Sequence, residues 1–275
     1  MPDILRQPFS FSQSCLQDYA DCPRRFRLRY VDQLTWPAVE SEPVAENEHR
    51  QQEGQIFHRL VQQHLLGLPT ENLARLANMP NLARWWENYI VSDLGLNGYT
   101  IFTESALSAP LGAHRLLAKY DLIAIDTKKE KATIVDWKTY AKRPRDEWMS
   151  VRWQTRVYRL LLAVAGDHLN DGQPIVPEQI EMIYWYADFP SQPARFKYTS
   201  AQFKRDWSAI EKVVKEISST KEFPMTEDEK MCRFCVYRSY CDRGKQAGAM
   251  DEAEAEMESE AAFDVNFEQI GEIEF

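Results

Sequence analysis

The chain has 275 residues, of which 44% are hydrophobic, and it carries 8 Trp, 12 Tyr and 13 Phe. This length and composition predict one large domain with an accessory subdomain and exclude a disordered or fibrous chain. The net charge of -9 is uneven, because residues 251–275 hold 10 acidic residues and no Lys or Arg, which leaves 32 acidic against 33 basic residues in 1–250. A near-neutral body can carry a local basic groove, so the low pI does not exclude nucleic acid as a ligand.

The sequence shows no membrane or export signal. Its apolar runs, such as residues 160–166, are too short to cross a bilayer. The N-terminal residues lack the charged and apolar regions of a signal peptide, so we expect a cytoplasmic location and no membrane partner. In that reducing compartment, closely spaced cysteines favour metal or redox chemistry over disulfides.

The first hundred residues have the spacing of helices. Ser12 is suited to cap one short helix, and Pro23 is suited to the first turn of a second, which is rich in arginine. Residues 35–47 are polar and predict a loop. Apolar residues recur at helical spacing over 53–67, and residues 71–94 predict further helix, interrupted near Pro80.

From Tyr99 onwards the pattern changes to strands. Three strand-like runs are expected at 100–110, 114–126 and 131–139, the last two joined by a polar turn at 127–131. A long helix over about 145–168 follows, then strands at 179–189 and 194–199 and a helix at 200–219. This order predicts an α/β sandwich with helices around a mixed sheet.

Two acidic residues and a lysine are predicted to meet on the second hairpin. Asp121 lies within one strand, while Asp136 and Lys138 lie near the end of the next and share a face of it. Two carboxylates suit Mg²⁺ or Mn²⁺, which activates water and polarises a phosphodiester, and the lysine orients that water or offsets negative charge. The alternative is a solvated strand end.

These residues belong to a series of motifs in which the chain resembles the PD-(D/E)XK nuclease superfamily. The resemblance covers residues 10–243 and is to the RecB-like branch, which includes AddB and the CRISPR-associated exonuclease. The motifs are GQIFH at 54–58, YDLIAID, DWKT, QTRVY at 154–158 and the N-terminal segment SQSCLQDYADCPRRF with the C-terminal cysteines. Tyr120 precedes the first acid where the superfamily name has Pro.

The resemblance implies a role for each motif residue. Asp121 and Asp136 with His58 would be ligands of a divalent metal, and Lys138 would be catalytic. Gln154 and Tyr158, four residues apart on one helical face, would grip the scissile phosphate or an adjacent base. An imidazole ligand suits Mn²⁺ better than Mg²⁺. The alternatives are an ordinary histidine and a packed amphipathic helix.

The implied fold is restriction-endonuclease-like. A nuclease core at 48–219, with a helical insertion at about 69–95, would be joined by a helical iron-sulfur subdomain built from 1–34 and 220–244. The implied activity is a divalent-metal-dependent deoxyribonuclease, an exonuclease acting on single-stranded DNA or DNA ends in repair or recombination. The alternative is a catalytically idle DNA-binding subunit of a helicase-nuclease or CRISPR adaptation complex, and a helicase or another repair or CRISPR protein would be its partner.

Further residues are candidates for ligand or DNA contacts. Glu104, in the first strand, is either an additional acidic ligand or a solvent-facing strand residue. The arginines of the second helix and those after Lys138 could neutralise phosphates, and neighbouring aromatic residues could stack bases. The alternative is that these arginines lie on a solvated surface and the aromatics in the core: Arg24, Arg25, Arg27, Arg29, Lys142, Arg143, Arg145, Arg152, Arg156, Arg159, Trp137, Tyr140, Trp148 and Trp153.

Three cysteines fall within ten residues near the C-terminus, at Cys232, Cys235 and Cys241. Their spacing places three thiolates close enough to share one metal centre and leaves one position open. The resemblance implies Cys22 as the fourth ligand and a [4Fe-4S] cluster, with zinc as the alternative since both accept four thiolates. Cys15 competes for this role but is typical of a small buried thiol. The centre would staple the two ends of the chain.

The acidic segment 251–275 is expected to be a disordered solubilising tail. The alternative is that it imitates nucleic acid in a basic groove or docks on a partner.

Overall fold

The structure, a computed structural model, describes residues 5, 7–35, 42–128, 130–233 and 235–243. Within them a mixed sheet is built around β3, which pairs antiparallel with β2 and β4 and, at its start, parallel with β1. β4 and β5 are parallel, and β6 closes the far edge antiparallel to β5. The strands are β1 (Ser10–Phe11), β2 (Thr100–Leu111), β3 (His114–Asp126), β4 (Lys131–Lys138), β5 (Ile180–Tyr186) and β6 (Ala194–Lys197).

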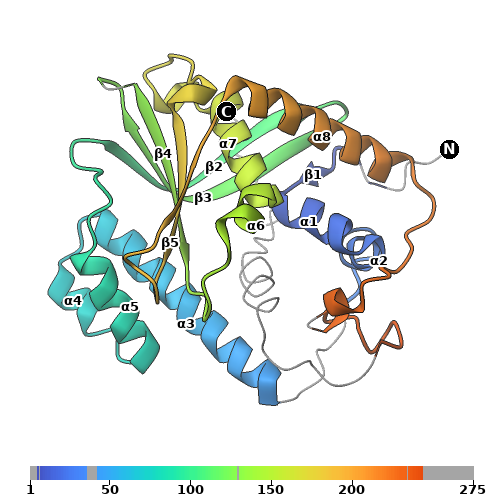
Figure 1. Ribbon diagram of the computed structural model, residues 1–275, viewed down its shortest axis with the longest axis horizontal. Helices are drawn as coiled ribbons and strands as arrows, with labels where there is room; N and C mark the ends of the chain where they lie inside the picture. The colour runs from blue at the N-terminus through green and yellow to red at the C-terminus, as the bar shows by residue number, and fades with distance from the viewer. Residues whose placement is uncertain (1–4, 6, 36–41, 129, 234, 244–275) are drawn as a thin grey trace.

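Helices cover both faces of this sheet (Figure 1). The α-helices are α1 (Gln13–Asp21), α2 (Pro23–Phe26), α3 (Glu42–Leu65), α4 (Thr70–Ala74), α5 (Pro80–Val91), α6 (Asp146–Val151), α7 (Trp153–Ala165) and α8 (Ser200–Ser219). A π-helical turn (Arg27–Val31) extends α2, and short 3-10 turns lie at Asp167–Leu169, Pro177–Gln179 and Glu229–Cys232. The predicted α/β fold with a mixed sheet flanked by helices is confirmed.

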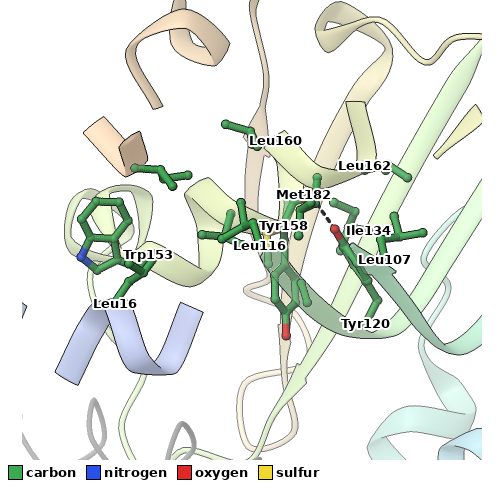
Figure 2. Close-up of a cluster of buried hydrophobic side chains, with 14 of the residues drawn as sticks. Leu16, Leu107, Leu116, Tyr120, Ile134, Trp153, Tyr158, Leu160, Leu162 and Met182 are labelled. Atoms are coloured by element: carbon green, nitrogen blue, oxygen red, sulfur yellow. Dashed lines mark hydrogen bonds between the residues drawn. The ribbon is translucent and has the colours of Figure 1, made fainter. Parts of the chain in front are cut away.

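Two hydrophobic cores lie on opposite faces of the sheet. The larger joins the sheet to α1, α7 and α8, and Figure 2 shows part of it, where Leu160 and Leu162 of α7 lie near Met182 and Ile134 of the sheet. The smaller joins the other face to α3, α4 and α5, and Phe57 stacks on Trp185 within it, with ring centroids 6.0 Å apart. Because the sheet is covered on both sides, side chains at its centre are shielded from water.

The two cores explain why the strands are so apolar. β4 lies between its antiparallel neighbour β3 and its parallel neighbour β5. Seven of its eight residues are buried. A strand covered on both faces has no solvent side to carry polar residues. The polar residues that remain in it, among them Asp136 and Lys138, therefore need partners within the protein.

The helix boundaries differ from the sequence expectation in two places. The predicted loop at 35–47 is wrong in its second part, because α3 already begins at Glu42, while residues 36–41 lie outside the described range. The single helix expected over 145–168 is divided at Arg152, whose backbone is extended (ψ 146°). Thr155 Oγ1 donates to the carbonyl of Met149 at 2.6 Å and so satisfies a carbonyl at the end of α6.

Other boundaries agree closely. β3 and α8 have the expected bounds, α1 begins after Ser12, and Pro80 begins α5. The two-residue strand β1 was not expected from the sequence. Among the described residues, no helix has both the length and the apolar composition needed to cross a bilayer. The acidic segment 251–275 lies outside the described residues.

Candidate active site

The β2–β3 pair is irregular beside Asp121. Thr103 pairs with Leu122 and Ser105 with Tyr120, but Glu104 and Asp121, which face each other between them, form no ladder pair. Glu104 has a φ of 53°, a left-handed backbone that costs a residue with a side chain about 1–2 kcal/mol.

At this point the side chains of both strands change the face of the sheet to which they point. Tyr120 belongs to the core under α7, whereas Leu122, two residues on, belongs to the core under α3. In a regular strand these two side chains would share one face. Asp121 therefore lies at the position where the side chains of β3 change from one face of the sheet to the other. Groups from both faces can reach it.

The β3–β4 ladder ends next to the same residue. Towards the C-terminal end of β4, the last pair of this ladder is Leu122 with Val135. Beyond it, the backbone N–H of Trp137 donates to Asp121 Oδ2 at 2.9 Å. The carboxylate thus takes the place of a strand carbonyl, which fixes the Asp121 side chain between the separating strands.

Asp136, Lys138 and Gln154 form a closed hydrogen-bonded triad. Gln154 Nε2 donates to Asp136 Oδ1 at 2.8 Å, and Lys138 Nζ donates to Gln154 Oε1 at 2.9 Å. Lys138 Nζ also lies 3.0 Å from Asp136 Oδ2. All three side chains are buried, so the ammonium and the carboxylate are held by each other and by the amide rather than by water.

His58 approaches from the opposite face of the sheet. Its Nδ1 lies 3.3 Å from Asp121 Oδ2, and its side chain is 9% exposed. One turn earlier in α3, a Cβ on Gly54 would lie 2.8 Å from Thr139 Oγ1. Glycine therefore permits the close approach of α3 to the end of β4 that brings His58 to the carboxylates.

Burial and mutual charge perturb the acids of the site in opposite directions. Burial raises the pKa of Asp136 to about 6, with Lys138 lowering it and the charge of Asp121 raising it further. Burial also acts to raise the pKa of Asp121, but the charge and hydrogen bond of His58 and the Trp137 N–H lower it overall. The pKa of His58 is raised, because Asp121 outweighs the lowering by burial.

Asp121, Asp136 and His58 offer donor types that suit a divalent cation. His58 Nδ1 lies 3.3 Å from Asp121 Oδ2, and burial together with the negative charge of Asp121 raises the pKa of Asp136. A hard cation would relieve that charge, and oxygen with some nitrogen suits Mg²⁺ or Mn²⁺. In the described part of the chain, no three His, Cys, Asp or Glu side chains are already arranged around one metal position.

Tyr158 lies deeper than Gln154 on the same helix. Its hydroxyl donates to the carbonyl of Lys119 at 2.7 Å and accepts from Gln13 Nε2 at 3.4 Å. Its ring packs on Tyr120, with centroids 4.6 Å apart, and the Tyr120 hydroxyl donates to the Tyr158 carbonyl at 2.8 Å, the dashed contact in Figure 2. These contacts tie α7 to β3 beside Asp121, and a direct grip of Tyr158 on a phosphate stays a prediction.

Several other candidates have partners within the protein. Glu104 forms an ion pair with Lys119. Arg25, Arg27 and Arg29 pair with aspartates, Arg156 pairs with Asp206 and stacks on Trp153, and Arg159 is buried. The expectation that the aromatic residues stack bases is wrong for three of them, Trp137, Tyr140 and Trp153, which are buried. Lys142 and Arg145 are exposed in the segment after β4, so their contact with DNA stays a prediction.

The cysteines form a second cluster, away from the carboxylates. Cys22, Cys232, Cys235 and Cys241 line one pocket together with Arg25, Arg238 and Arg243. Their thiols are free of disulfides, and burial together with the neighbouring thiols raises the pKa of Cys232. Cys15 is apart from them, with its Sγ 3.2 Å from the Ser12 carbonyl.

Two segments far apart in the sequence, near residues 22–34 and 223–243, meet around this pocket. The Arg24 N–H donates to the Pro224 carbonyl at 3.0 Å, and the Tyr237 hydroxyl donates to the Leu34 carbonyl at 2.9 Å. Phe223 stacks on Phe26, with an interplanar angle of 9°.

Sequence reasoning missed several residues that shape the active site. Tyr184 of β5 lies beneath Lys138, with Nζ 5.4 Å from its ring centroid, and its hydroxyl is 3.3 Å from Gln154 Oε1. Gln13 reaches Tyr158 from α1. Tyr184 lies in a strand whose only charged residue is Glu181, and Gln13 lies in a short polar run, so no spacing pattern marks either residue.

One comparison with known proteins identifies a family for this chain. The sequence profile of the PD-(D/E)XK nuclease superfamily matches residues 10–242. Among solved structures, the crystal structure of SSO0001 is similar, with 12% sequence identity and a TM-score of 0.41 over 84% of this chain and 85% of that chain. A search of curated proteins gives no significant match.

Proposed function

This chain belongs to the PD-(D/E)XK nuclease superfamily of metal-dependent nucleases, and we propose that it hydrolyses DNA as an exonuclease acting on single strands or ends. One observation carries the proposal. Asp121, Asp136 and Lys138 converge with His58 and Gln154 in one buried network. Two acids and a lysine at the point where two strands separate are the groups that phosphodiester hydrolysis needs.

Asp121, Asp136 and His58 would hold Mg²⁺ or Mn²⁺. When bound, the divalent ion supplies a polarised phosphate and a water of lowered pKa. The chain supplies the arrangement of charge around it. Asp121 is kept ionised by His58 and by the Trp137 N–H, while Asp136 is kept in place by Gln154.

Lys138 would orient the attacking water and offset the negative charge that develops on the phosphate. Its ammonium is held at 2.9 Å by Gln154 Oε1 and lies over the ring of Tyr184. Burial makes the interaction of this charge with a phosphate stronger than it would be in water. Gln154 acts on the reaction by holding both Asp136 and Lys138, which are two residues apart on β4.

The alternative is a catalytically idle DNA-binding subunit. The intact network argues against it, since an idle protein gains nothing from a buried lysine held against Asp136. The buried ion pair costs desolvation energy, which hydrophobic residues of similar volume would avoid.

We propose that Cys22, Cys232, Cys235 and Cys241 hold a [4Fe-4S] cluster. Four thiols in one pocket suit either iron-sulfur or zinc. The resemblance to RecB-like nucleases supports the cluster over zinc. The absorption near 400 nm of anaerobically purified protein, together with iron and zinc content, decides between the two metals.

We also propose that the cluster segments, 1–34 with 220–244, form a subdomain beside a nuclease core at 48–219. The core would act in DNA repair or recombination, and a helicase or a CRISPR protein would supply unwinding. The tie between the Tyr237 hydroxyl and the Leu34 carbonyl supports the subdomain, because it joins the two segments outside the core.

The experiment that tests the nuclease compares Lys138→Ala with Lys212→Ala on end-labelled single-stranded DNA in Mn²⁺. Lys212 is exposed on α8 and has no role in the proposed site, so its replacement removes one positive charge from the surface. We expect Lys138→Ala to lose at least about 100-fold in rate, on the scale of a lost preorganised charge, and Lys212→Ala to stay within a few-fold. An inactive wild type would favour the idle subunit, and an active Lys138→Ala would remove the lysine from the mechanism.

A further inference from the structure

Helix α1 lies between the cysteine pocket and the active-site helix α7. At the pocket end, Arg25 pairs with two aspartates of α1, its Nε 2.7 Å from Asp18 and its Nη2 2.8 Å from Asp21. Asp21 in turn accepts a hydrogen bond from Gln17 Nε2 at 2.7 Å. Arg25 lines the cysteine pocket, so this chain of contacts begins beside the thiols.

At the other end, Gln17 caps α7. Its Oε1 accepts the backbone N–H of Trp153 at 3.4 Å, a long bond but a buried one. The first N–H groups of a helix have no partner within it, and no neighbouring side chain of α7 caps its start. Gln17 is 7% exposed, so water does not readily replace it. The residue after Trp153 in α7 is Gln154, which forms hydrogen bonds with Asp136 and Lys138.

A second contact of α1 reaches the same helix. Gln13, one turn before Gln17, donates to the Tyr158 hydroxyl at 3.4 Å. The two glutamines therefore touch α7 at its first residue and one turn later. α1 fixes both the position and the rotation of the helix that carries Gln154.

We infer that Gln17 is a positioning residue that sets the start of α7 and, through Asp21 and Arg25, couples it to the cysteine centre. The thiolates of Cys22 and of Cys232, Cys235 and Cys241 would be held in place by the bound centre, and Arg25, which lines the same pocket, would be held against them. When the centre is lost, Arg25 loses that anchor, Asp21 is freed to move with it, and Gln17 no longer presents Oε1 to Trp153. The coupling rests on the proposed metal centre of the cysteines, and its consequence for catalysis rests on the proposed nuclease function as well.

The test measures the rate of amide hydrogen exchange at the α6–α7 junction, over residues 149–158. This measurement does not require the protein to be an active nuclease. Gln17→Met keeps the volume and removes both hydrogen bonds, and Gln63→Met, on α3 beyond the sheet, is the matched control. With the metal centre loaded, we expect Gln17→Met to speed exchange at the start of α7 about tenfold and leave iron or zinc content unchanged. Gln63→Met should leave the junction as in the wild type.

The second arm removes the centre from the wild type with a chelator. Exchange at the start of α7 should rise to the level of Gln17→Met, and chelation of that variant should add little there, because the connection is already broken. Exchange within β4 serves as the reference for an intact core. Unchanged exchange at residues 149–158 in either arm, with β4 protected, would overturn the inference.

Two further measurements keep the result interpretable. If Gln17→Met does not fold, Gln17→Glu replaces it, since a carboxylate still accepts from Trp153 but repels Asp21. In that variant the amides at the start of α7 should exchange as slowly as in the wild type while the metal centre is bound. Removing the metal with a chelator should not change their exchange rate. In nuclease assays, loss of the cap should lower kcat rather than raise KM, because Gln154 contacts the reacting groups. An inactive wild type would reject the nuclease proposal and leave the exchange results to decide the coupling.

Discussion

The contact between Gly54 and Thr139 makes the placement of His58 directly testable. In Gly54→Ala the new Cβ would lie 2.8 Å from Thr139 Oγ1, about 0.6 Å inside ordinary contact distance, whereas the Thr139 Cβ and Cγ2 would both lie at 3.8 Å. We expect the helix to move by roughly that amount, because one of the two other staggered rotamers of Thr139 puts its methyl group in the same place and a β-branched side chain is stiff at χ1. His58, one turn later, then withdraws from its 3.3 Å contact with Asp121.

The expected result separates activity from stability. Alanine improves the helix by about 1 kcal/mol and the overlap costs about 1–3 kcal/mol, so the variant should be at most about 2 kcal/mol less stable. A misplacement of 1 Å costs on the order of 100-fold in rate, so 0.6 Å predicts a loss of about tenfold or more. Nuclease rates in Mn²⁺ and thermal unfolding measure the two quantities.

The double variant Gly54→Ala/Thr139→Ala is the control. Removing Oγ1 leaves only the Thr139 Cβ, at 3.8 Å, so the second change should restore most of the rate that the first removes. Equal rates for Gly54→Ala and the wild type, or a double variant no faster than Gly54→Ala, would refute the reasoning.

Three other outcomes follow from the structure. Cys22→Ser should lose the bound metal, seen as iron or zinc content, while Cys15→Ser should keep it; equal loss from both would contradict the proposed ligand set. Saturating Mn²⁺, at about 100 times its Kd, should stabilise the wild type by about 2.7 kcal/mol and raise its Tm; Asp121→Asn should lose that rise while Asp206→Asn keeps it, and an equal rise in both would place the ion elsewhere. Glu104→Gly should be about 1–2 kcal/mol more stable in unfolding free energy than Glu104→Ala, because the left-handed backbone is costly for any residue with a side chain, a difference that would vanish if the positive φ were not retained.

Much of the fold follows from local signals in the sequence. Ser12 caps α1, Pro80 starts α5, and the polar turn between β3 and β4 fixes their hairpin. The pairing of Asp136 with Lys138 also follows from the alternation of strand faces, since both residues lie on β4. These features depend on a few neighbouring residues, which is why a single sequence reveals them.

The position of Asp121 could not be obtained in that way. Its approach to both faces depends on the irregular pairing opposite Glu104 and on the end of the ladder at Val135, and both arise from contacts between strands. The division of the predicted long helix at Arg152 is similar, because the helical spacing of apolar residues continues across it. The arginines show the same limit, since their composition suggested phosphate contacts, whereas most of those described pair with acids that the fold brings to them.

The meeting of Cys22 with residues near the other end of the chain has a consequence for biosynthesis. A ribosome adds about 5–20 residues per second, so roughly 10–40 s separate the synthesis of this cysteine from that of Cys232, Cys235 and Cys241. During that interval the sheet and its helices can form, but the proposed cysteine centre cannot bind a metal. A nascent or prematurely terminated chain would thus leave Cys22 as a lone thiol, and metal loading would mark only those molecules whose synthesis had passed Cys241.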